Sequence, residues 1–132
     1  MNVHPPWTRV VAGACVVALG EPIAGLFGND KSLSDDLVAA GDARFERCWP
    51  MPVLPEHSAE LASKIADTRS TGTSRSAGAC TAAAFLKRFV EDGVKWAHVD
   101  IAGPAMPSNS PTYSGFGAQL LTEYAMRCAR EQ

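Results

Sequence analysis

Two short apolar segments near the amino end open the pattern of hydrophobic positions. They span residues 10–19 and 23–27, and Gly20, Glu21 and Pro22 separate them. Continuous valine-rich runs bounded by turn residues are typical of strands that are buried on both faces of a sheet. The pattern therefore predicts two buried strands at the start of the fold.

A helix is predicted to follow these strands. Ser32-x-x-Asp35 has the spacing of a capping box, and Asp35 and Asp36 would lie near the positive end of the helix dipole. The charged run at residues 42–47 is interpreted as a solvated face of this helix. The predicted buried face consists of residues that recur at helical spacing: Leu33, Leu37, Val38, Gly41 and Phe45.

The middle of the chain has a less regular pattern. Pro50, Pro52 and Pro55 argue against a central strand there, because proline cannot donate a hydrogen bond to a neighbouring strand. A short helix is predicted over residues 56–63. Residues 69–76 are polar and are predicted to form a loop.

The second half of the chain predicts two helices around one strand. A helix is expected at residues 78–92, with Gly93 as its left-handed stop, and the alternation over residues 95–102 predicts a strand. The buried side of that helix is expected to comprise Ala79, Ala82, Ala83, Leu86, Phe89 and Val90. A last helix would bury Phe116, Leu120, Leu121, Tyr124 and Cys128. Strands that alternate with helices indicate an α/β fold.

Composition and charge narrow the class of protein. The chain has 132 residues, 46% of them hydrophobic and 20% charged, which are values of one globular domain and not of a disordered chain. Twelve basic and 14 acidic residues leave a net charge of −2, and no stripe of basic residues favours nucleic acid. The four cysteines are far apart in sequence, which indicates buried thiols in a reducing compartment.

The amino end loosely resembles a secretory leader, because Arg9 precedes an apolar run. That run is shorter than the ~20 apolar residues that span a bilayer, and Pro5 and Pro6 do not fit a basic leader. We therefore expect a cytoplasmic chain without a membrane partner. A cleaved leader is the alternative.

Two groups of residues could carry chemistry. Gly72-x-Ser74-x-Ser76 approaches the nucleophile elbow of serine hydrolases, but Ser76 replaces its second glycine, so a polar loop before a helix is the favoured interpretation. His98 and Asp100 would share one face of a strand, where they could bind a metal or form a base and its orienting group. A metal site needs three or four converging ligands, which favours a structural role for this pair.

Four blocks of the sequence resemble the leucyl (cytosol) aminopeptidase family. They are residues 13–20 (GACVVALG), 77–86 (AGACTAAAFL), 96–104 (WAHVDIAGP) and 114–124 (SGFGAQLLTEY). Because the blocks keep the family's order and spacing, the resemblance covers about residues 13–128. It identifies residues 13–132 as the C-terminal portion of an aminopeptidase catalytic domain.

The resemblance implies a fold, an activity and partners. The expected fold is α/β, part of a mixed β-sheet flanked by helices, as in a truncated aminopeptidase catalytic domain. The family's enzymes remove N-terminal amino acids from peptides, typically as homo-hexamers. Two divalent cations, zinc or manganese, polarise the scissile carbonyl and supply a hydroxide in the complete enzyme.

The same resemblance places those cations outside this chain. The family's signature Asn-Thr-Asp-Ala-Glu-Gly-Arg, which holds two metal ligands and an arginine, would lie upstream of Gly13 and is absent. Residues 1–12 do not resemble the family and are expected to be an unrelated or disordered leader. The resemblance thus implies no catalytic residue and no bound metal in this chain, which would be inactive alone.

Four positions match residues that line or adjoin the family's substrate-specificity pocket. They are Gly13, Ala102, Ala105 and Met106. The structural alternative is that these small residues allow strands and helices to pack closely. For the whole chain the alternative is a non-catalytic family member that acts as a structural or assembly subunit.

Overall fold

A computed structural model describes residues 13–130 of the chain. Within them, three strands form one mixed sheet in the order β2-β1-β3. The central strand β1 (Ala24–Gly28) pairs in parallel with β2 (Cys48–Met51) and antiparallel with β3 (Ala97–Asp100). The expected fold class, a mixed β-sheet flanked by helices, is confirmed.

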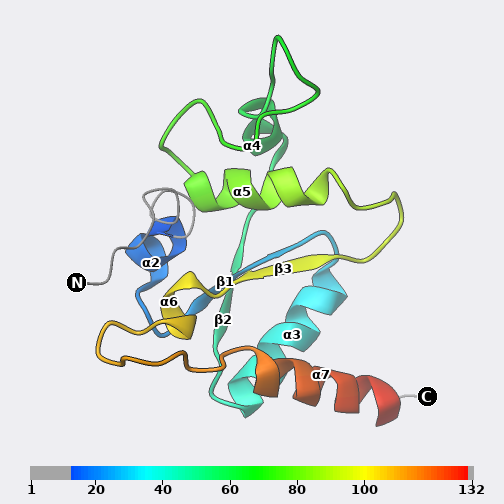
Figure 1. Ribbon diagram of the computed structural model, residues 1–132. Helices are drawn as coiled ribbons and strands as arrows, with labels where there is room; N and C mark the ends of the chain where they lie inside the picture. The colour runs from blue at the N-terminus through cyan, green and yellow to red at the C-terminus, as the bar shows by residue number, and fades with distance from the viewer. Residues whose placement is uncertain (1–12, 131–132) are drawn as a thin grey trace.

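Helices cover both faces of the sheet (Figure 1). Helices α2 (Gly13–Leu19) and α5 (Gly78–Lys87) lie on one side, with α4 (Pro55–Ala59) beyond α5. Helices α3 (Lys31–Ala43) and α7 (Ala118–Arg130) pack together on the other side. The short helix α6 (Ala102–Ala105) follows β3 and contacts α2. This arrangement gives three layers with a separate core on each face of the sheet.

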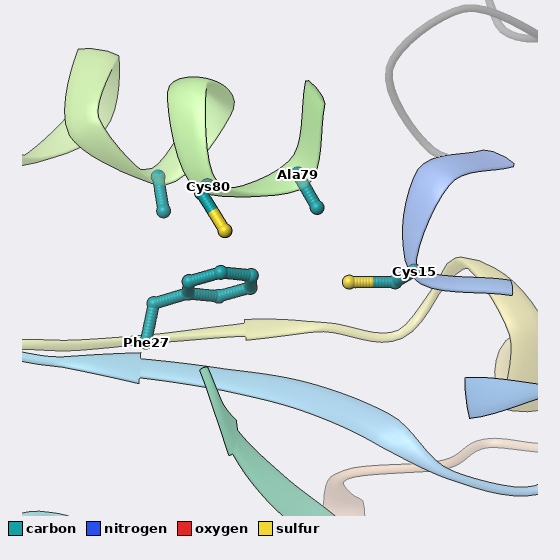
Figure 2. Packing of buried hydrophobic residues seen from close by; sticks show 5 residues of the cluster. Cys15, Phe27, Ala79 and Cys80 are labelled. Carbon is teal, nitrogen blue, oxygen red and sulfur yellow. The ribbon is translucent and has the colours of Figure 1, made fainter. Parts of the chain in front are cut away.

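The core on the α5 side is built around the ring of Phe27. Ala79, Cys80 and Ala83 of α5 pack over this ring, and Cys15 of α2 points toward it from the end of the sheet (Figure 2). Small residues on α5 let its backbone lie close to the strand. The opposite core contains residues from four elements: Ala24, Leu26, Leu37, Cys48 and Leu120.

The first apolar segment forms a helix, so the prediction of a buried strand over residues 10–19 is wrong for its described part. Cys15 is 2% exposed whereas Val17 is 89% exposed, and such one-sided burial fits a helix and not a strand with both faces covered. Gly20, with φ +76°, ends the helix, and its N–H donates to the carbonyl of Val16. Residues 10–12 lie outside the described part.

Helix α3 begins one residue before the predicted capping box. Its N-cap is Asp30, whose carboxylate accepts a hydrogen bond of 2.8 Å from the Leu33 N–H. Lys95 adds an ion pair to the same carboxylate at 3.2 Å. The Ser32 and Asp35 capping box is therefore wrong, and Asp35 instead pairs with Lys31 at the surface.

The end of α3 departs from the predicted buried face. Phe45 is 89% exposed and adopts φ +58°, a left-handed conformation that usually belongs to glycine. The Glu46 N–H donates to the Gly41 carbonyl and the Phe45 N–H to that of Asp42, which is the pattern of a Schellman motif. The turn buries Gly41 and directs Phe45 to solvent.

The charged run at residues 42–47 also differs from the predicted solvated face. Glu46 is only 8% exposed, and its carboxylate accepts a 2.7 Å hydrogen bond from the Leu120 N–H in the first turn of α7. Arg44 forms an ion pair of 2.7 Å with Glu123 of α7, which also pairs with Arg127. These charges therefore join the two helices of this layer.

The other predicted elements are recovered with shorter bounds. Helix α5 ends at Lys87 and not at residue 92, so Phe89 lies beyond it. Leu86 and Phe89 are both exposed, although both were predicted to be buried. Gly93 has the predicted left-handed φ, +81°, but lies in a turn beyond the helix. In α7 the buried stripe includes Leu120, whereas Leu121 is exposed. Strand β2 contains Pro50 at the edge of the described sheet, which agrees with the exclusion of a central strand.

Phe45→Gly is expected to stabilise the chain. The left-handed backbone costs a non-glycine residue about 1–2 kcal/mol, and glycine's greater unfolded-state freedom offsets part of this, so we expect a gain of up to about 1 kcal/mol in urea unfolding. Tyr113→Gly, which removes an exposed aromatic side chain without a positive φ, is the matched control. A loss of stability in Phe45→Gly would contradict the assignment of this turn.

Glu46→Ala is expected to destabilise the chain, because the first turn of α7 would lose its carboxylate partner. A cap of this kind contributes about 1–2 kcal/mol, measurable as a lower free energy of unfolding in urea. Glu91→Ala removes an exposed carboxylate and should leave stability unchanged. Equal effects of the two substitutions would show that Glu46 does not cap α7.

Candidate functional site

The predicted pocket residues lie on two elements that contact each other. Ala102 and Ala105 are the first and last residues of α6, Met106 follows directly, and Gly13 begins α2. Ala102 and Ala105 are half-buried, and the Met106 side chain is about half exposed. The structure thus brings three of the four positions together on one short segment and places the fourth on the helix beside it.

Close backbone packing holds α6 against the turn that follows α2. A Cβ atom on Gly103 would lie 3.0 Å from the carbonyl oxygen of Gly20 and 3.1 Å from the Cα of Glu21. The Glu21 carboxylate also accepts hydrogen bonds of 3.1 Å from both the N–H and the hydroxyl of Ser108. The loop after α6 is therefore tied to the same turn.

Ser114 gives the carboxyl end of α6 a further support. Its hydroxyl donates to the Pro104 carbonyl at 2.6 Å, and its N–H donates to the Ala105 carbonyl at 3.0 Å. These bonds satisfy carbonyl groups that a four-residue helix leaves without partners. The short segment that carries Ala102 and Ala105 is thereby fixed at its carboxyl end.

His98 and Asp100 share one face of β3, as predicted, but they have separate surroundings. The His98 ring stacks with the rings of Phe27 and Trp96, at centroid distances of 5.8 and 6.5 Å. Burial lowers the pKa of His98, against the opposing effect of the Asp100 charge. Asp100 accepts a 3.1 Å hydrogen bond from the Ala102 N–H. Over residues 13–130, no three His, Cys, Asp or Glu side chains are grouped so as to hold a metal ion.

The serine-containing loop is organised by a carboxylate. Glu60 accepts hydrogen bonds from the backbone N–H groups of Thr73 and Ser74 and from the Thr73 hydroxyl, and these bonds lower the pKa of Glu60. The Ser74 hydroxyl in turn accepts from the Ser76 N–H. The loop precedes α5 and follows no strand, which supports the polar-loop interpretation over a nucleophile elbow.

A shallow, open hollow of about 300 Å³ lies elsewhere on the molecule. Arg44, Ala118, Gln119 and Thr122 line it, at the contact between α3 and α7. None of the predicted pocket positions contributes to it. The Arg44 guanidinium is already paired with Glu123, so the hollow offers no unpaired charge from that residue.

Comparison with known proteins defines the class first. The catalytic-domain model of the cytosol aminopeptidase family matches residues 10–122. The chain belongs to the cytosol aminopeptidase family.

Particular relatives then place the chain within that family. A probable cytosol aminopeptidase of Methylorubrum extorquens is 50% identical over 116 residues, and one of Chlorobaculum parvum is 45% identical over 117 residues. These alignments cover 84% and 86% of this chain and 23% of each relative. A mutant of tomato leucine aminopeptidase superposes with a TM-score of 0.83 at 37% identity, over 87% of this chain and 23% of that one. The chain thus spans about a quarter of the length of its relatives.

Sequence reasoning missed the contribution of Cys15 and Asp100 to this region. It placed Cys15 on a strand and treated Asp100 only in relation to His98. The structure instead places Cys15 on α2, beside the strand end that carries Asp100.

No helix in residues 13–130 is long and apolar enough to cross a bilayer.

The buried thiols predict a loss of stability at alkaline pH. Burial, assisted by the Asp100 charge, raises the pKa of Cys15 to about 12, and burial with Glu46 and Asp42 raises that of Cys48 to about 11, from 9.0. The unfolded thiols therefore ionise first, so the free energy of unfolding should fall as pH rises above 9. Urea unfolding at pH 7, 9 and 10 measures this slope.

Substitutions test whether these two thiols cause the fall in the free energy of unfolding above pH 9. The double variant Cys15→Ala, Cys48→Ala should show a shallower loss of stability between pH 9 and 10 than the unchanged chain. Cys128→Ala, which removes a half-buried thiol of α7, is the control and should keep the original slope. Identical slopes in all three chains would mean that other groups govern the alkaline transition.

Proposed function

We propose that this chain is the C-terminal part of the catalytic domain of a leucyl aminopeptidase, an enzyme that removes N-terminal amino acids from peptides. The match to the family's catalytic-domain model over residues 10–122 carries this proposal. The superposition on tomato leucine aminopeptidase supports it. Since the chain spans 23% of each relative, the activity would belong to the complete enzyme.

The role of this segment would be to form part of the substrate side-chain pocket. Gly13, Ala102 and Ala105 carry little or no side chain and would leave space for an apolar group. Met106, with a flexible apolar side chain that is about half exposed, could adapt to that group. Contact between α2 and α6 supports a shared wall built from these positions.

The two cations expected in the complete enzyme do not fit the residues described here. Zinc needs about four nitrogen, sulfur or oxygen ligands, and manganese prefers an oxygen-rich set. The His98 ring is stacked with two aromatic rings, and the Asp100 carboxylate already accepts a backbone N–H. We therefore assign no catalytic step to these residues and expect the zinc or manganese ligands in another part of the enzyme.

The remaining partners follow from the family. We propose a cytoplasmic enzyme that acts on peptides and assembles as a homo-hexamer, in line with relatives named cytosol aminopeptidases. The second candidate is a non-catalytic subunit that docks onto complete family members.

A segment exchange tests the proposed function. Residues 13–130 would replace the matching segment of the Methylorubrum extorquens relative, which is 50% identical. We expect the exchanged enzyme to hydrolyse leucine amide with added manganese, because this segment would supply part of the pocket wall while the recipient would supply the metal ligands. The isolated 132-residue chain should show no turnover with zinc, manganese or cobalt.

Two results would contradict this assignment. Metal-dependent turnover by the isolated chain, purified from a host that lacks its own aminopeptidase, would show that it holds a catalytic centre. A folded, hexameric exchanged enzyme without activity would favour the non-catalytic subunit. The unexchanged relative, assayed in parallel, sets the reference rate.

A further inference from the structure

The two elements that carry the predicted pocket positions must keep a fixed separation if they are to form one wall. Their contact at the carboxyl end of α2 involves Gly103, Gly20 and Glu21, as described above. The start of α6 needs its own support, because Ala102 lies at that end. The side chain placed there is Asp100, the last residue of β3.

Asp100 holds the start of α6 directly. Its Oδ1 atom accepts the Ala102 N–H at 3.1 Å, so the carboxylate fixes the first residue of the helix relative to the sheet. The backbone of Asp100 is itself placed by the pairing of β3 with β1, where Asp100 lies opposite Gly25. The carboxylate is therefore anchored to the central strand.

Cys15 of α2 reaches the same place from the other side. A Cβ atom on Gly25 would lie 2.6 Å from the Cys15 Sγ, so the thiol rests on the strand at the residue opposite Asp100. The thiol is 2% exposed, and the Asp100 charge acts on it, since that charge contributes to the raised pKa of Cys15. Because burial, with a further contribution from this carboxylate, raises the pKa of Cys15 to about 12, the thiol stays protonated at neutral pH and can donate to the carboxylate.

We propose that Asp100 is a positioning residue of the substrate pocket: its carboxylate joins α2, through Cys15, to α6, through Ala102. This inference rests on the proposed function. Removal of the carboxylate would leave both donors without a partner and would let α6 shift relative to α2. Gly25 is part of the device, because a larger residue would displace the Cys15 thiol from the strand.

Hydrogen exchange on the 132-residue chain tests the link itself. Asp100→Ala should raise the exchange rate of amides in α6 and α2 by about tenfold, while α7, on the opposite face of the sheet, keeps its rate. Cys15→Ala should have the same effect on α2 and a smaller one on α6. Unchanged exchange in both helices of Asp100→Ala would overturn the proposal.

Conservative variants separate the link from general damage to the fold. Asp100→Asn retains an oxygen acceptor for the Ala102 N–H, so amides of α6 should keep nearly their original exchange rates, whereas those of α2 should exchange faster because the amide nitrogen cannot accept from the thiol. Cys15→Ser retains a donor and should leave the rates of both helices nearly unchanged. Asp35→Asn, which removes a surface carboxylate paired with Lys31, is the matched control. If Asp100→Asn speeds exchange in α6 as much as Asp100→Ala does, the hydrogen-bonded link is wrong.

The role in the pocket is tested in the exchanged aminopeptidase. Asp100→Ala should lower kcat/KM for leucine amide about tenfold more than for alanine amide, and Asp100→Asn, which keeps the acceptor for the Ala102 N–H, should change this preference less. A merely structural role would lower kcat/KM for both amides by the same factor, and that result would overturn the pocket assignment. Asp35→Asn should change neither value.

The two experiments fail in different ways. An exchanged enzyme without activity before any further substitution contradicts the proposed function, and the pocket role of Asp100 falls with it. The hydrogen-exchange rates of α2 and α6 in the isolated 132-residue chain and its Asp100→Ala variant still decide whether Asp100 joins these helices. Faster exchange together with unaltered substrate preference overturns the pocket role alone.

Discussion

The burial of strand β1 on both of its faces is the constraint on which the rest of the fold depends. Alternate side chains of a strand point to opposite faces, so Phe27 enters the core beneath α5 while Leu26 enters the core above α3 and α7. Both neighbouring strands pair with β1. Every layer is thus positioned by five residues, of which two, Gly25 and Gly28, allow close approach of other groups.

Strand β1 was predicted correctly from a short apolar run bounded by turn residues. Among the helices, the ten residues of α5 and the stripe around Leu120 have a clear helical period. Residues 13–19 do not, because seven consecutive apolar residues fit a buried strand and a helix equally well. The glycine at position 20 is the local signal that favoured a helix, since a left-handed residue commonly ends one.

The errors at Phe45 and Glu46 have a tertiary origin. Helical spacing places Phe45 on the buried face of α3, but the chain must turn before it to bring β2 alongside β1. The Glu46 carboxylate then accepts a hydrogen bond from the first turn of α7, a helix more than 70 positions away in sequence, in place of a cap from a neighbouring residue. A charged run gives no sign of such a distant partner, so the pattern alone predicted a solvated surface.

The pocket positions were predicted from a family resemblance, whereas the contacts that fix α2 and α6 relative to each other are seen only in the structure. Gly13 and Ala102 have no side-chain chemistry that would single them out, and the spacing of 89 positions hides their common location. Glycines at 25 and 103 let a thiol and a backbone turn approach closely, which places α2 and α6 without a large side chain between them. A wall built from small residues can keep its shape only if neighbouring polar groups fix its backbone. In the proposed pocket, Cys15, Asp100, Glu21 and Ser114 would serve this purpose.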